Sequence, residues 1–210
     1  MQPTPKNTGW IEVICGPMFS GKTEELIRRL KRAVIGQQRV QIFKPRIDKR
    51  YSDDSIVSHS DLRLEGTPVD RIEEIEGLLA RDTEVVGIDE IQFFGPAAVG
   101  VCERLANRGL RVIVAGLDQD YRGVPFEPVP QLLAIAEYIT KELAVCVVCG
   151  NPAGRSQRLT SDARRVVVGA QGAYEARCRA CFRPDGDQPT ELSSARQVRL
   201  PLPSTEVTEG

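Results

Sequence analysis

Residues 10–23 read WIEVICGPMFSGKT, and this stretch decides the fold. The apolar run from Trp10 to Cys15 predicts a buried strand, and residues 16–23 follow the pattern G-x-x-x-x-G-K-[ST]. Apolar residues then recur at helical spacing from residue 24 to residue 34. A strand, a glycine-bounded loop and a helix N-terminus form the context in which this pattern binds phosphates, so the sequence predicts a nucleoside triphosphate site.

The loop supplies the groups that capture an anion. Consecutive backbone N–H groups can surround a phosphate, and the helix dipole adds partial positive charge at the same point. Lys22 adds a charge for the β- and γ-phosphates of ATP, and the Thr23 hydroxyl is a ligand for Mg²⁺. We therefore predict that all eight loop positions contact the nucleotide: Gly16, Pro17, Met18, Phe19, Ser20, Gly21, Lys22 and Thr23.

A second predicted strand ends in two carboxylates. Residues 84–90 read EVVGIDE, and an acid after a buried strand is the Walker-B arrangement, in which Asp89 lies across from Thr23 and holds Mg²⁺. Neighbouring side chains of a strand point to opposite sides, so we expect Glu90 to face the phosphoryl acceptor. Gln92 follows and is included among the predicted nucleotide contacts.

Strands and helices are predicted to alternate along the chain. Strands at residues 39–43 and 111–116 join helices at residues 24–34, 72–79 and 95–108, which indicates an α/β fold with ligands at the carboxyl ends of its strands. The loops after residues 15, 88 and 116 then lie at one edge of the sheet. Their apolar side chains are candidates for a slot beside the phosphates: Met18, Phe93, Phe94, Leu117, Tyr121 and Phe126.

Residues 46–63 form a polar stretch without clear periodicity, which predicts a long loop near the phosphate site. Within it, Arg50 is either a contact to phosphate or substrate, or a solvated surface arginine. His59 is the single histidine of the chain, and we interpret it as a surface or structural residue.

Four of the six cysteines form two Cys-x-x-Cys pairs, Cys146 with Cys149 and Cys178 with Cys181. Four thiolates complete a tetrahedral Zn²⁺ site with no open position, which predicts a structural zinc; a redox function of one pair is the alternative and leaves the other pair unexplained. The segment between the pairs is expected to fold over the mouth of the active site. We interpret Cys15 and Cys102 as small buried hydrophobic residues.

Composition narrows the class of protein. The 210 residues carry a formal net charge of -1, which argues against a nucleic-acid binder, and 41% are hydrophobic, enough for a buried core. No run of 18 apolar residues predicts a membrane span, and the N-terminus lacks the pattern of a signal peptide. We therefore expect a cytoplasmic protein with no membrane or nucleic-acid partner.

Four motifs together carry a resemblance to a known family. GPMFSGKT at residues 16–23, DEIQFF at 89–94, GLDQDYRGVPF at 116–126 and the two cysteine pairs occur in this order, and the chain resembles the type II thymidine kinases over about residues 9–182. That resemblance implies a RecA-like P-loop domain followed by a zinc-held lasso. It also implies transfer of the γ-phosphoryl group of ATP to the 5′-hydroxyl of thymidine, which gives thymidine monophosphate for DNA synthesis.

The resemblance also assigns roles to residues. It implies that Glu90 is the general base, that Lys22 and Arg50 act on the transferred phosphate, and that Asp89 is the Walker-B acid. It places the nucleoside in a pocket formed by Met18, Phe93, Leu117, Tyr121, Phe126, Ser156 and Tyr174. It further implies a homotetramer inhibited by thymidine triphosphate. Ser156 stands where the family often has threonine, Ile91 where a smaller residue is common, and the lasso turn GAQGA lacks the double glycine of some relatives.

The expected organisation is a flexible tail at residues 1–8, a nucleotide-binding domain at 9–143, a zinc-binding lasso at 144–183 and a flexible tail at 184–210. The alternative within enzymes is a RecA-like P-loop ATPase with a zinc ribbon that acts on nucleic acid. Such an ATPase would use Glu90 to activate water and would hydrolyse ATP without any nucleoside.

Overall fold

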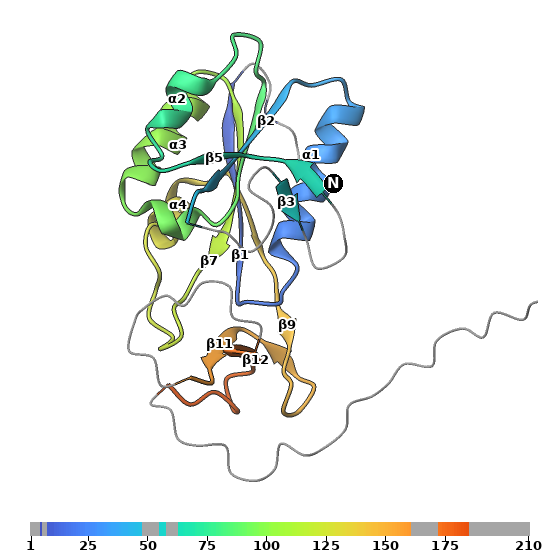
Figure 1. Ribbon diagram of the computed structural model, residues 1–210, viewed down its shortest axis with the longest axis vertical. Coiled ribbons are helices and arrows are strands. Elements are labelled where there is room, and N and C mark those ends of the chain that lie inside the picture. The colour runs from blue at the N-terminus through green and yellow to red at the C-terminus, as the bar shows by residue number, and fades with distance from the viewer. Residues whose placement is uncertain (1–4, 6–7, 48–54, 58–62, 161–171, 185–210) are drawn as a thin grey trace, which may run out of the picture.

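The computed structural model describes residues 5, 8–47, 55–57, 63–160 and 172–184, and its centre is a six-stranded parallel sheet (Figure 1). The strand order is β5-β2-β6-β7-β1-β8. The strands are β1 (Trp10–Gly16), β2 (Val40–Pro45), β5 (Thr67–Val69), β6 (Val85–Ile88), β7 (Arg111–Leu117) and β8 (Tyr138–Lys141). A parallel sheet flanked by helices is the predicted α/β class.

The central strands are apolar because helices cover both faces of the sheet. Helix α1 (Lys22–Ile35) lies on one face, where Leu26, Ile27 and Leu30 are fully buried. Helices α2 (Glu74–Leu78), α3 (Ala97–Asn107) and α4 (Val129–Ile135) lie on the other face (Figure 1). Gly87 of β6 permits the close approach of α1, since a Cβ there would lie 2.7 Å from a methyl carbon of Leu30.

The predicted elements occur with shifted ends, and two strands of the sheet were not predicted. Strand β2 continues through Pro45, whereas the strand predicted at residues 39–43 ended at Phe43. The unpredicted strands are β5, which has three residues, and β8, which alternates between half-buried and exposed residues at the edge of the sheet. Both are short edge strands, and neither has the apolar run that marks a central parallel strand.

Smaller elements surround the sheet. A hairpin of β3 (Ser55–Val57) and β4 (Arg63–Glu65) precedes β5, and a short 3-10 helix, η1 (Ile91–Phe94), follows β6. After β8, the chain forms two antiparallel pairs: β9 (Ala144–Val145) with β10 (Pro152–Ala153), and β11 (Arg155–Arg158) with β12 (Tyr174–Arg177). These two pairs lie beyond the carboxyl ends of the sheet strands (Figure 1).

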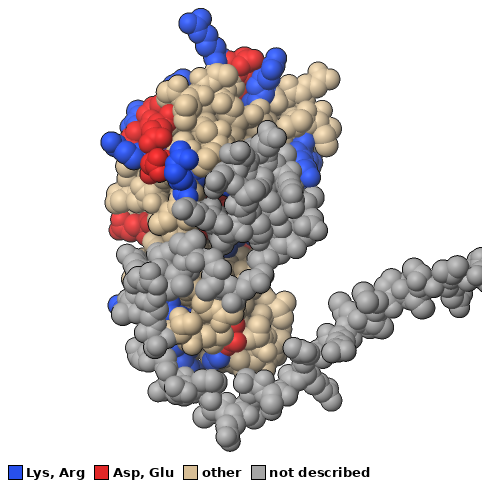
Figure 2. Space-filling view, in the orientation of Figure 1, with Lys and Arg blue, Asp and Glu red and all other residues tan. Residues whose placement is uncertain are grey.

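Charged side chains of both signs are mixed over the face shown in Figure 2. One ion pair joins two helices, with Arg104 of α3 2.7 Å from Glu76 of α2. Mixed charge agrees with the net charge of -1. In the part of the chain that the structure describes, no helix has both the length and the apolar character needed to cross a membrane.

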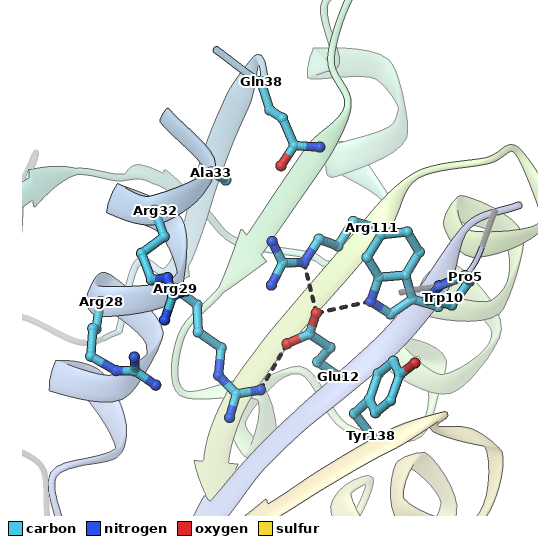
Figure 3. Close-up of a pocket in the computed structure, with 10 residues that line it drawn as sticks. All are labelled: Pro5, Trp10, Glu12, Arg28, Arg29, Arg32, Ala33, Gln38, Arg111 and Tyr138. Carbon is cyan, nitrogen blue, oxygen red and sulfur yellow. Dashed lines mark hydrogen bonds and ion pairs between the residues drawn. The ribbon is translucent and has the colours of Figure 1, made fainter. Parts of the chain in front are cut away.

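A buried carboxylate ties α1 to the amino ends of the strands (Figure 3). Glu12 of β1 accepts hydrogen bonds from Trp10 Nε1 at 2.8 Å, Arg29 at 2.7 Å and Arg111 at 2.7 Å. Burial acts to raise the pKa of Glu12, but the donors, Arg111 first, outweigh it and the pKa is lowered. These side chains line a cavity of about 480 Å³. Arg28 and Arg29 bond to Glu25, and Arg29 and Arg111 bond to Glu12, so the arginines of this cavity stabilise the fold.

Replacing Glu12 by Gln is expected to lower the free energy of unfolding by about 2 kcal/mol at neutral pH, because Arg29 and Arg111 lose charged hydrogen bonds. Since the pKa of Glu12 is lowered by folding, its contribution is present above the ordinary value of 4.5 and is lost as the pH falls through the folded pKa. Urea unfolding curves should therefore separate wild type from E12Q at neutral pH and bring them together in acid.

The matched control is Asp82→Asn, which breaks an exposed pair whose side chains, Arg39 and Asp82, are 73% and 60% exposed. That change should stay within about 0.5 kcal/mol. Equal losses for the two variants would contradict the bracing role of Glu12.

Candidate active site

The phosphate-binding loop connects β1 to α1 in a conformation that depends on glycine. Gly16 has a φ of 147°, and a Cβ there would lie 2.3 Å from the carbonyl oxygen of Glu142. Gly21, the residue before α1, is left-handed with a φ of 83°. Phe19 also has a positive φ, 64°, and its side chain is exposed. The loop therefore places consecutive backbone amides at the N-terminus of α1, as an anion site requires.

Lys22 and Thr23 both lie at the start of α1. The buried Lys22 ammonium donates to the carbonyl of Pro17 at 2.6 Å, and the Ser20 hydroxyl donates to the same carbonyl at 2.8 Å. The Thr23 hydroxyl donates to Asp89 Oδ2 at 3.1 Å. The structure thus brings Thr23 and Asp89 together, although one strand, β7, separates their strands β1 and β6.

Asp89 and Glu90 lie in a turn after β6, which we call the acid turn, and not in the strand that was predicted to separate their side chains. Strand β6 ends at Ile88, and Glu90 is left-handed with a φ of 50°. Asp89 Oδ1 accepts the backbone N–H of Glu90 at 2.9 Å, which stabilises this turn. Asp89 and Glu90 are 6% and 7% exposed, so both carboxylates are buried. The turn, and not strand alternation, directs them to different partners.

Gln92 holds the turn against the neighbouring strand. Its amide nitrogen donates to Glu90 Oε2 at 2.5 Å, and its amide oxygen accepts the backbone N–H of Leu117 at 3.0 Å. Gln92 is 3% exposed, and both ends of its amide bond to protein groups. Gly116 makes room for it, because a Cβ there would lie 2.6 Å from the Gln92 oxygen. In this geometry, Gln92 positions Glu90.

The apolar candidates divide into two groups. Met18, Phe93, Phe94, Leu117 and Tyr121 are half-buried, whereas Phe126 is buried. Of the half-buried residues, Phe94 packs against the core that includes side chains of α3 and α4. Tyr121 lies in a turn that Asp120 stabilises by accepting two backbone N–H groups, those of Arg122 and Val124. Phe94 thus contributes to the core, and the other half-buried side chains stay candidates for the predicted slot.

The module after β8 contacts the loops at the carboxyl edge. The Ser156 hydroxyl of β11 accepts the backbone N–H of Met18 at 3.0 Å. Arg158 of β11 donates to the Tyr174 hydroxyl at 2.6 Å and stacks on the ring of Tyr121 at 3.6 Å. Ser156 thus contacts Met18 of the phosphate loop, and Arg158 connects Tyr174 with Tyr121. The sequence offered no signal for Arg158, because its partners are distant in sequence.

One further acid at this edge was not predicted. Asp118, just after β7, is buried and lies 2.5 Å from the ammonium of Lys141 at the end of β8. This pair joins two strands that flank β1. No local spacing marks it in the sequence.

The four paired cysteines form one cluster. Their sulfurs all lie within 4.8 Å of one another, and Cys149 lies 3.6 Å from both Cys178 and Cys181. A tetrahedral zinc with bonds of about 2.3 Å separates its sulfur ligands by about 3.8 Å, so the cluster fits this ion. Burial acts to raise the pKa of Cys146, but backbone N–H donors, that of Cys178 first, lower it to about 6. Such donors favour the thiolate that a metal binds.

The other cysteines are buried, as expected. Burial raises the pKa of Cys15 to about 11 and that of Cys102 to about 12, which keeps both as neutral thiols. Arg50 and His59 lie outside the described residues, as does the segment from 161 to 171 between the cysteine pairs.

Comparison with known proteins decides the family. The family model described as thymidine kinase matches residues 9–182, which is most of the chain. The chain belongs to the thymidine kinase family. A thymidine kinase of Rhodothermus sp. (strain ITI 518) is 59% identical over 198 residues, which make up 94% of this chain and 90% of the relative.

A second thymidine kinase, from Bdellovibrio bacteriovorus (strain ATCC 15356 / DSM 50701 / NCIMB 9529 / HD100), is 56% identical over 182 residues, 87% of this chain and 89% of the relative. Among solved structures, domain III of the Thermotoga maritima replication initiation protein DnaA matches with a TM-score of 0.37 at 17% identity. That match covers 63% of this chain and 54% of the other chain.

In this member of the thymidine kinase family, the conformation of the acid turn at Asp89 and Glu90 is expected to depend on Gly116. In Gly116→Ala the new methyl group meets Gln92 and Ile91, so Gln92 is pushed away from Glu90 and the melting temperature falls by several degrees. Thermal unfolding followed by circular dichroism measures this shift. Gly77→Ala is the control, since nothing lies within 4 Å of its Cβ, and it should leave the melting temperature unchanged or raise it.

Cys149→Ser removes one of four sulfur ligands and is expected to reduce bound zinc to well below one ion per chain. Elemental analysis of purified protein by mass spectrometry gives the zinc content. Cys102→Ser, which changes a buried cysteine of α3 outside the cluster, should keep its zinc. Full zinc occupancy in the Cys149 variant would contradict a four-cysteine site.

Proposed function

We propose that the protein transfers the γ-phosphoryl group of ATP to the 5′-hydroxyl of thymidine, giving thymidine monophosphate. The observation that carries the proposal is the acid turn after β6, where Asp89 bonds to Thr23 of the phosphate loop and Glu90 is buried beside it. Membership of the thymidine kinase family supports the choice of acceptor.

The phosphate loop is proposed to hold ATP through its backbone amides and Lys22. In the structure, the Lys22 ammonium donates a hydrogen bond to the neutral Pro17 carbonyl. A negatively charged phosphate oxygen in place of this carbonyl would add charge–charge attraction. Thr23 and Asp89 are the residues proposed to hold Mg²⁺, which neutralises charge on the phosphates when bound. Arg50 is proposed as a further positive charge near the transferred group.

Glu90 is proposed as the general base that accepts the proton of the 5′-hydroxyl. Phosphoryl transfer needs mainly positioning and charge stabilisation from the protein, and a carboxylate within reach of the attacking oxygen completes it. The hydrogen bond from Gln92 to Glu90 Oε2 restricts the orientation of the Glu90 carboxylate. Gln92, which was predicted to contact the nucleotide, is also proposed to act through Glu90, because both ends of its amide bond to protein groups.

The nucleoside is proposed to lie between the phosphate loop and the module of residues 144–183 that carries the four paired cysteines, called here the zinc module. Its walls are the residues predicted from the sequence: Met18, Phe93, Leu117, Tyr121, Phe126, Ser156 and Tyr174. Backbone groups of the lasso are proposed to bond the pyrimidine edge, and cytosine inverts the pattern of donor and acceptor at that edge. A buried polar group left without its partner makes such rejection steep.

The assembly and regulation of the enzyme are proposed from the family resemblance. We infer a nucleotide-binding domain at residues 9–143 and a structural-zinc lasso at residues 144–183. We also propose a homotetramer that works in the cytoplasm and is inhibited by thymidine triphosphate.

The direct test offers ATP labelled at the γ-phosphate with each deoxynucleoside and each ribonucleoside in turn. Label is expected in thymidine monophosphate, with little or none in the cytidine and purine products. Release of labelled phosphate at the same rate with and without nucleoside would instead support a P-loop ATPase.

Glu90→Gln keeps the shape of the side chain and removes its basicity, so kcat is expected to fall by about 10² to 10⁴. Binding of ATP, measured by calorimetry, should stay close to that of wild type, because Lys22 and Thr23 are unchanged. Glu103→Gln on the exposed face of α3 is the control and should turn over normally. Near-normal turnover of the Glu90 variant would remove it as the base.

A further inference from the structure

Strand β11 is the part of the zinc module that contacts the rest of the site. Each of its four residues bonds to a group outside the strand, and three of them reach the nucleotide-binding part of the chain. The contacts are Arg155 with Gln119, Ser156 with the backbone N–H of Met18, Gln157 with the backbone of Arg183, and Arg158 with Tyr121 and Tyr174.

Arg158 contacts two residues of the proposed nucleoside pocket, Tyr121 and Tyr174. It is 7% exposed, and the central carbon of its guanidinium lies 3.6 Å from the centroid of the Tyr121 ring. At the edge of the guanidinium, Nη2 and Nε lie 2.6 Å and 3.2 Å from the Tyr174 hydroxyl oxygen. Arg158 and Tyr174 are also register partners in the β11–β12 pair.

The two tyrosines come from different parts of the molecule. Tyr121 lies in the loop after β7, and Tyr174 begins β12 of the zinc module, which lies beyond the end of β7 in Figure 1. A single planar guanidinium stacks on one ring and donates to the hydroxyl of the other. A guanidinium can do both at once because its face is apolar and its edge carries the donors. The buried position makes both contacts stronger than they would be in water.

We propose that Arg158 is a positioning residue for the acceptor nucleoside: it holds Tyr121 and Tyr174 at a fixed separation, and so sets the width of the slot that receives the base. The inference rests on the proposed function, because it concerns the nucleoside side of that reaction. Arg158 acts through the two tyrosines. Its loss should therefore weaken nucleoside binding and leave ATP binding unchanged.

The test uses the full chain in three variants: Arg158→Met, Arg158→Lys and the control Arg179→Met. Arg179 is exposed in the same module, so its replacement removes the same charge without touching either tyrosine. Arg158→Met is expected to raise the KM for thymidine about tenfold or more, with a smaller change in kcat and an unchanged KM for ATP. The control should match wild type, and all three variants should retain zinc.

Arg158→Lys separates positioning from charge. A lysine keeps the positive charge but has neither the planar face nor the fork of donors. Under the proposal, it behaves like the Met variant. If Lys restores the wild-type KM for thymidine, the role of Arg158 is its charge and the proposal is overturned.

A double-mutant cycle with Tyr174→Phe tests the contact itself. Tyr174→Phe keeps the ring and removes the hydroxyl that accepts the bond from Arg158. The effects of the two changes on kcat/KM for thymidine should be non-additive, with the double variant close to Arg158→Met alone. Additive effects, or an unchanged thymidine KM in Arg158→Met, would overturn the proposal.

These outcomes are distinct from failure of the proposed function. If wild type phosphorylates no nucleoside, the proposed reaction is wrong and the Arg158 inference falls with it. If wild type phosphorylates thymidine and Arg158→Met matches it in every constant, only the role of Arg158 is wrong.

Discussion

The hydrogen bond between Thr23 and Asp89 crosses the carboxyl edge of the sheet, and the site depends on it. Thr23 begins α1 after β1, whereas Asp89 follows β6, and β7 lies between these two strands. The acid turn must therefore extend over the end of β7 to reach the phosphate loop. Gly116 near the end of β7 leaves the space for it, and the backbone N–H of Leu117 holds it there through Gln92.

The four-cysteine module contacts the same edge. Ser156 accepts a backbone N–H from the phosphate loop, and Arg158 stacks on a tyrosine of the loop after β7. Because the two strand pairs of the module bury few apolar side chains, a metal bound by the four-cysteine cluster would supply the cross-link that a larger core otherwise provides. The module presents single side chains to a site built by the sheet.

Local patterns in the sequence predicted the phosphate loop, the central strands and the cysteine cluster. Each of these is encoded by spacing within a short window, such as Gly21-Lys22-Thr23 or Cys146 to Cys149. The left-handed conformation of Glu90 was not predictable in this way, because a glutamate gives no signal for positive φ and the surrounding contacts impose it. The partners of Gln92 and Arg158 lie 25 and 37 residues away, at Leu117 and Tyr121 in the folded chain, so only tertiary structure reveals them. Strand β8 was missed because an edge strand lacks the apolar run of a central one.

A crystal structure of the protein with thymidine and a non-hydrolysable ATP analogue tests the central claim most directly. The account predicts that the Glu90 carboxylate lies within hydrogen-bond distance of the thymidine 5′-hydroxyl, which points at the terminal phosphate held by Lys22. A complex in which that hydroxyl contacts a different side chain, with Glu90 directed away from the nucleoside, would contradict it.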